Sequence, residues 1–136
     1  MKRLFFILSI VASMNIFGQS GVYVYGHPKD VEKSLKWTLS LNEDGTFLYH
    51  FYRKGGIPAE ENFYGKGTWW SDKNSIIFQT NKETDMDEKH TMDFTNSKAR
   101  YITKSPRDKS DKVVKTALRF YASEIPYIIG LNLLKE

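Results

Sequence analysis

Residues 35–51 read LKWTLSLNEDGTFLYHF, and this segment decides the fold of the chain. Large apolar side chains alternate with small or polar ones on both sides of the pair Asp44-Gly45. An Asp-Gly pair between two alternating runs is a strong signal for a β-hairpin, because Gly adopts the turn conformation without steric cost. The segment therefore predicts two antiparallel strands joined by a tight turn.

The turn type decides which residues of the two strands face each other. A three-residue loop that ends with Gly45 in the left-handed conformation places Leu41 opposite Phe47. The same register puts six apolar or aromatic side chains on one face, namely Trp37, Leu39, Leu41, Phe47, Tyr49 and Phe51. The other face is mixed in polarity and carries His50. We therefore predict that the apolar face points inward and that His50 points the other way.

The same alternation recurs along the rest of the chain. It predicts further strands at 22–25, 63–70, 76–80, 91–95, 99–103, 113–121 and 127–134. No segment has convincing helical periodicity. Closely spaced strands with turn-rich connections are typical of a barrel or a sandwich. We predict a single all-β domain, an antiparallel up-and-down β-barrel of eight or nine strands.

The first residues have the layout of a secretory signal peptide. A basic start is followed by an apolar run over residues 4–17 and then by small or polar residues. The run is shorter than the roughly 20 apolar residues that a membrane span needs. We therefore assign residues 1–18 to a signal peptide and residues 19–136 to the barrel domain, with cleavage after Ser20 as the other choice.

The chain contains no cysteine. A lipid anchor at the cleavage site, disulfide bonds, thiolate metal sites and cysteine nucleophiles are therefore excluded. Loss of Lys2 and Arg3 with the signal peptide lowers the formal net charge from +4 to +2, so the mature domain is only weakly basic. We expect an exported monomer, periplasmic or secreted, which has no lipid anchor and no membrane span and relies on its own core for stability.

The order of the hairpins resembles that of a known group of proteins. Residues 39–47 follow the pattern Leu-x-Leu-x-x-Asp-Gly-Thr-Phe, and Gly67-Thr68-Trp69 leads to Ile76-Ile77-Phe78. Over residues 21–80 this order is similar to that of small secreted lipocalin-like β-barrel proteins, including the barrel domain of envelope copper-resistance lipoproteins. The resemblance implies a lipocalin-like barrel that could hold a ligand in a cavity. It implies no copper function, because the chain lacks the anchoring cysteine and the Cys-x-x-Cys-like features of the copper-related group.

Side chains that carry chemistry are sparse. The three histidines, His27, His50 and His90, are not at metal-ligand spacing, and no serine lies in a Gly-x-Ser-x-Gly motif. The acidic run 83–90 could attract a hard cation, but it lacks the glycine and the spacing of a calcium loop and is interpreted as a solvated turn. We therefore expect a protein that is not an enzyme and that needs no cofactor and no metal.

Aromatic residues make up 15% of the chain and supply the candidate ligand-binding residues, which are Trp37, Tyr49, Phe51 and Trp69. An eight-stranded barrel is about wide enough either to be filled by side chains or to hold one small ligand. Because neighbours on a strand face opposite ways, one of Trp69 and Trp70 must leave the core. The leading hypothesis is a non-catalytic binding module for a small apolar or amphipathic ligand, with the connection 53–62 as a flap.

Basic residues outnumber acidic residues by eight to two between residues 96 and 120. Arg100, Lys115 and Arg119 in this stretch are candidate anion-binding residues, because a basic stripe attracts phosphates or acidic polymers. For an exported protein, the expected anion is an acidic glycan or a lipid headgroup rather than nucleic acid. The alternative function is a structural or interaction protein whose barrel is filled and whose outer surface contacts an envelope partner.

Overall fold

The computed structural model describes residues 18–26, 34–55 and 59–136. Within these ranges the chain forms a nine-stranded sheet in the order β3-β2-β1-β9-β8-β7-β5-β4-β6, and a further pairing of β3 with β4 closes it. The elements are β1 (Gly21–Gly26), β2 (Ser34–Leu41), β3 (Thr46–Lys54), β4 (Glu60–Asp72), β5 (Ser75–Gln79), β6 (His90–Met92), β7 (Ser97–Ile102), β8 (Ala117–Ala122), the 3-10 helix η1 (Pro126–Ile128) and β9 (Asn132–Lys135). Every pairing in the closed ring is antiparallel, whereas β6 lies outside the ring and runs parallel to β4. The predicted all-β up-and-down barrel is confirmed.

The opening hairpin has the predicted register. Trp37 lies opposite Phe51, and Gly45 has a φ of 86°. The Asp44 carboxylate accepts hydrogen bonds from the Thr46 backbone N–H at 2.9 Å and from the Thr46 hydroxyl at 2.6 Å. An Asp side chain that binds the backbone two residues further on stabilises a turn, so this loop holds β2 and β3 in register.

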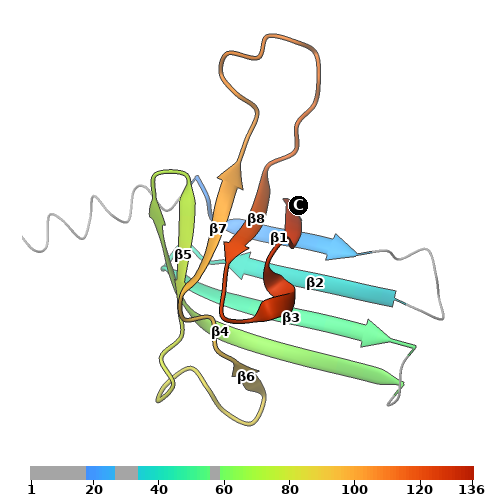
Figure 1. Ribbon diagram of the computed structural model, residues 1–136, viewed down its shortest axis with the longest axis vertical. Helices are drawn as coiled ribbons and strands as arrows, with labels where there is room; N and C mark the ends of the chain where they lie inside the picture. The colour runs from blue at the N-terminus through green and yellow to red at the C-terminus, as the bar shows by residue number, and fades with distance from the viewer. Residues whose placement is uncertain (1–17, 27–33, 56–58) are drawn as a thin grey trace, which may run out of the picture.

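Strand β4 belongs to two parts of the barrel, because it pairs with a different strand at each end. Its residues 60–68 pair with β3, and its residues 68–72 pair with β5. Figure 1 shows strands β1–β4 side by side, with β5, β7 and β8 running steeply across them. The end of β1 and the end of β3 project beyond η1 on one side of this crossing (Figure 1). Strands β5, β7 and β8 therefore cover only part of the inner face of β1–β4.

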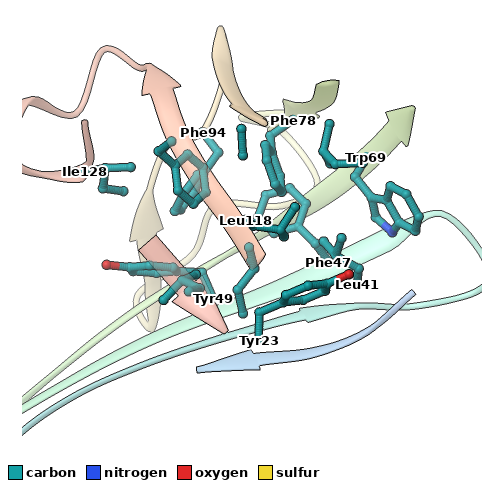
Figure 2. Close-up of a cluster of buried hydrophobic side chains, with 14 of the residues drawn as sticks. Tyr23, Leu41, Phe47, Tyr49, Trp69, Phe78, Phe94, Leu118 and Ile128 are labelled. Carbon is teal, nitrogen blue, oxygen red and sulfur yellow. The ribbon is translucent and has the colours of Figure 1, made fainter. Parts of the chain in front are cut away.

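Large side chains from both halves fill the interior (Figure 2). Phe94 lies within this cluster although it belongs to no strand. Its fully buried ring packs against Phe47 at 5.3 Å, Tyr49 at 4.8 Å and Phe120 at 6.4 Å between ring centroids. Because these rings come from opposite sides of the barrel, Phe94 occupies its middle, and this part of the interior is packed rather than hollow.

Gly65 and Gly67 lie on the inner face of β4. A Cβ atom at Gly65 would lie 2.7 Å from Cε2 of Phe94, and one at Gly67 would lie 2.1 Å from the backbone oxygen of Gln79. The two glycines therefore let the Phe94 ring and the end of β5 approach β4 closely.

The prediction that residues 53–62 form a flap is wrong. Strands β3 and β4 continue into this segment and pair there, with Arg53 opposite Glu61 and an ion pair between the two side chains. Cross-strand pairs of opposite charge stabilise a hairpin, so the strands extend further than the glycines suggest. Residues 56–58, the centre of the expected flap, lie outside the described residues.

Three later strands are shorter than expected. The strand expected at 113–121 begins only at Ala117. Val113 favours a strand by residue type, but its side chain is 87% exposed and has nothing to pack against. The strand expected at 91–95 is limited to β6, because the chain turns inward at Phe94. The strand expected at 127–134 is interrupted by η1, which has a proline at its start.

The predicted signal peptide at 1–18 lies outside the described residues apart from Gly18. The domain boundary, export and the monomeric state therefore stay predictions. In the ranges that the structure covers, no helix is both long and apolar enough to cross a membrane.

Candidate functional site

Four aromatic residues, one from each of the strands β1–β4, form a row across the inner face of the sheet. The register places Tyr25 opposite Trp37, Trp37 opposite Phe51, and Phe51 opposite Phe63. The rings of Trp37 and Phe51 stack at 4.6 Å, and those of Phe51 and Phe63 stack at 5.8 Å. Tyr25 and Trp37 meet at 5.3 Å with tilted rings. We call these four residues the aromatic row.

The aromatic row is only partly covered by the rest of the protein. Trp37, Phe51 and Phe63 are half-buried and pack against the edge of the core, and Tyr25 is 39% exposed. These residues share the inward side of their strands with core residues such as Leu39, because positions two apart on a strand point the same way. The row is thus an extension of the core face that β5, β7 and β8 leave open.

Tyr49 lies beside the row, deeper in the barrel. It is two residues from Phe51 on β3, is 1% exposed, and has its ring against Phe94. Burial raises the pKa of its hydroxyl well above the usual value, and the neighbouring Tyr127 phenol adds to the rise. In Figure 2 the Tyr49 oxygen points away from the end of the cluster that holds Trp69 and Phe78.

The chain end supplies a second wall near Tyr49. Tyr127 in η1 is 57% exposed, and its hydroxyl donates to Sδ of Met92 at 3.7 Å. Ile129, which follows η1, is also exposed. The sequence did not single out Tyr127, Met92, Tyr25 or Phe63 as site residues. Phe63 could have been found by continuing the alternation of β3 through the next hairpin, had that segment not been interpreted as a flap.

The fourth candidate ligand-binding residue, Trp69, lies apart from the aromatic row. Its ring is buried near the opening hairpin, where its Nε1 donates to the backbone oxygen of Asn42 at 3.0 Å. Its neighbour Trp70 faces outward and is 43% exposed. The structure therefore brings Trp37 and Phe51 together, places Tyr49 next to them, and leaves Trp69 at a separate place in the core.

Two of the three candidate anion-binding residues meet on the outer surface. Arg100 on β7 lies directly opposite Arg119 on β8, and the Arg100 guanidinium lies 5.6 Å from the centre of the Tyr121 ring. None of the ion pairs found among the described residues involves either arginine. Lys115 precedes β8 and is exposed in the connection from β7, so it is not part of this strand pair.

The described histidines make local contacts, His50 between β3 and β4 and His90 with the turn that precedes β6. His50 points away from the core as predicted and stacks on Tyr64 at 4.5 Å. His90 Nδ1 lies 2.9 Å from the Asp87 carboxylate. The backbone N–H of His90 donates to the same carboxylate and is the main reason that the pKa of Asp87 is lowered to about 2. His27 lies outside the described residues, among which no cluster of three or more metal-ligating side chains is found.

An open polar hollow of about 490 Å³ lies beside the end of β5 and the start of β7. Its charged groups already interact with neighbours in the hollow. Lys82 Nζ lies 3.9 Å from the Asp93 carboxylate, and the Asn96 amide donates to Glu124 at 3.2 Å. This hollow shares no residue with the aromatic row and offers a ligand mainly hydrated, mutually paired groups.

No protein-family model matches the chain, and no significant match to it is found among curated proteins or solved structures. The barrel of eight antiparallel strands is consistent with a lipocalin-like barrel. The comparisons give no support to a relationship with lipocalins or with copper-resistance lipoproteins.

Proposed function

We propose that this protein is a non-catalytic binding module for a small apolar or amphipathic ligand whose flat apolar part lies on the aromatic row. The observation that carries the proposal is the row itself: four rings in register, on an inward face, at the end of a packed barrel. An isolated exposed ring is ordinary on a protein surface, whereas a contiguous aromatic surface is typical of a binding site.

The chemistry of the row favours a planar ligand. Stacked or tilted aromatic pairs contribute roughly 0.5 to 1.5 kcal/mol beyond the burial of their area. Ligand sites are commonly apolar surfaces with a few polar groups that set orientation. The Tyr49 hydroxyl interacts with Trp37 of the row and with Tyr127, and both tyrosines carry a phenol rather than an acid–base pair. This composition favours binding over catalysis.

Replacement of Trp37 by Ala is expected to weaken binding of the planar neutral dye Nile red by about tenfold, because the variant loses the central ring of the row. Nile red fluoresces strongly in an apolar site, so a fluorescence titration gives the affinity. Circular dichroism checks that the variant is folded. Trp70→Ala is the matched control, because Trp70 is an exposed tryptophan on the outer side of β4. Equal losses in the two variants would contradict binding at the aromatic row.

We propose a second candidate function for the outer surface, which is contact with an acidic glycan, a lipid headgroup or an envelope protein. Like charges directly opposite on neighbouring strands are destabilising. Arg100 and Arg119 nevertheless face each other without a carboxylate partner among the described residues. An anionic partner would relieve this repulsion, so the pair favours such a contact.

The double variant Arg100→Glu, Arg119→Glu is expected to elute from a heparin column at clearly lower salt than the unmodified protein. Heparin serves as a model acidic glycan. The control is Lys109→Glu, Lys112→Glu, which changes the net charge equally in the connection between β7 and β8. If both double variants elute at the same salt concentration, only net charge matters, and the arginine pair is not a specific contact.

A further inference from the structure

The hydroxyl of Tyr49 is a buried polar group without a hydrogen-bond partner. Among the described residues, only the Tyr49 hydroxyl and the Gln19 side-chain oxygen are buried side-chain groups without a hydrogen-bond partner. The other deeply buried tyrosine, Tyr23, donates from its hydroxyl to the backbone oxygen of Gln19 at 2.7 Å. Buried polar groups in folded proteins nearly always have a partner, so each exception needs an explanation.

The neighbours of Tyr49 do not supply that partner. The Trp37 indole N–H points to the Tyr49 oxygen closely enough to lower the pKa of the hydroxyl, although the geometry falls short of a full hydrogen bond. An indole N–H can only donate, so it leaves the Tyr49 proton without an acceptor. The Tyr127 hydroxyl, which also acts on Tyr49 electrostatically, donates to Met92 instead. The unmet hydroxyl thus lies between the aromatic row and η1, where the proposed ligand would have its edge.

The protonation state of Tyr49 decides which ligand group it can bind. A tyrosine phenol carries its proton at neutral pH, and burial raises the pKa of this hydroxyl further, so it can donate a hydrogen bond. A carboxylate would be a strong acceptor, but moving it into an apolar site costs several kcal/mol of hydration. An uncharged carbonyl oxygen accepts a hydrogen bond and leaves no donor of its own unpaired.

We propose that the aromatic row binds planar conjugated carbonyl compounds, such as aryl ketones and quinones, whose carbonyl oxygen accepts a hydrogen bond from the Tyr49 hydroxyl. This inference rests on the proposed function and adds the class of ligand and its orientation. The ring system stacks on Trp37 and Phe51, and the carbonyl edge points into the barrel toward Tyr49.

The binding test compares fluorenone with fluorene, which has the same flat ring system but no carbonyl group. Tyr49→Phe is expected to bind fluorenone about tenfold more weakly than the unmodified protein, because one hydrogen bond is lost. Its affinity for fluorene is expected to stay unchanged, because the aromatic ring at position 49 remains. Quenching of tryptophan fluorescence reports both titrations.

A stability test shows whether the Tyr49 hydroxyl lacks a hydrogen-bond partner in the free protein or is hydrogen-bonded to a water molecule. In the free protein, Tyr49→Phe removes a polar group without a partner, so its Tm should rise by about 2 to 5 °C. Tyr23→Phe is the matched control, and its Tm should fall because it loses the hydrogen bond to Gln19. Thermal denaturation followed by circular dichroism measures both variants.

The outcomes distinguish this inference from the proposed function. If Tyr49→Phe loses fluorenone and fluorene to the same extent, or if its Tm falls as that of Tyr23→Phe does, the carbonyl inference is wrong. The binding module still stands in that case, provided that fluorene binds and that Trp37→Ala weakens it. If neither compound binds the unmodified protein, both proposals are wrong.

Discussion

Replacement of Phe94 by Ala is expected to lower the free energy of unfolding by about 3 to 5 kcal/mol, the usual range for loss of a fully buried phenylalanine. Phe94 is 0% exposed, and its ring lies among Phe47, Tyr49, Phe78 and Phe120. These neighbours are held on strands on different sides of the barrel, so they cannot all move inward to fill the space. The cavity therefore stays largely open, and the lost contacts are not recovered.

Denaturant unfolding of the unmodified and variant proteins measures this loss. A typical domain has only about 5 to 15 kcal/mol of stability, so the midpoint should shift strongly. Val113→Ala is the control, because Val113 is almost fully exposed and its truncation should change the stability by less than about 0.5 kcal/mol. A loss below about 1 kcal/mol for Phe94→Ala would mean that Phe94 does not fill the centre of the barrel.

Replacement of Gly67 by Ala is expected to cost about 3 kcal/mol, the upper end of the usual range for overpacking. The added Cβ would lie 2.1 Å from the backbone oxygen of Gln79 and 3.0 Å from Cε1 of Phe47. A flexible side chain could move aside, but here the closest atom belongs to the backbone of β5. The variant must therefore push β4 and β5 apart where residue 68 pairs with Gln79.

The matched control for Gly67→Ala is Gly130→Ala. Gly130 has a φ of 92°, so an alanine there is strained, but a Cβ would have nothing within 4 Å. Its cost should be about 1 to 2 kcal/mol, from backbone strain alone. Denaturant midpoints of the two variants give the comparison. If Gly67→Ala proves no more damaging than Gly130→Ala, the close approach of the two strands is not a constraint on the fold.

The opening hairpin could be predicted residue by residue because the residues that determine its turn and register are close together in the sequence. Asp44-Gly45 sets the loop, and the alternation on both sides leaves only one register that buries Trp37 and Phe51 together. The inward positions of the hairpin residues and the outward position of His50 followed directly. This is why two of the four candidate ligand-binding residues are neighbours in the aromatic row.

The remaining site residues depend on contacts between distant segments. Phe63 was counted as a strand residue, but its place beside Phe51 required the pairing of β3 with β4 through a segment rich in glycine and charge. Tyr127 was expected within a strand, and the 3-10 turn at Pro126 changes which side chains face inward, so that Ile128 is buried and Ile129 is exposed. Local alternation carries no information about such a turn.

The packing of side chains in the middle of the barrel also could not be predicted from the alternation of apolar and polar residues. Phe94 lies in the segment 91–95, where a strand was predicted, and its side chain is buried. The Phe94 ring can enter the centre of the barrel because Gly65 leaves space for it, and Gly65 lies far from Phe94 in the sequence. The pairing of Arg100 with Arg119 is likewise set by the register of β7 and β8, not by either strand alone.

The three tryptophans report separately on three parts of the molecule: Trp37 on the aromatic row, Trp69 on the core and Trp70 on the outer surface. Their indole N–H signals can be followed one by one in proton–nitrogen correlation spectra while Nile red is added. We expect a saturable shift of the Trp37 signal, with the Trp69 and Trp70 signals nearly unchanged. A shift confined to Trp70, or an unmoved Trp37 signal under conditions where the dye binds, would contradict ligand binding at the aromatic row.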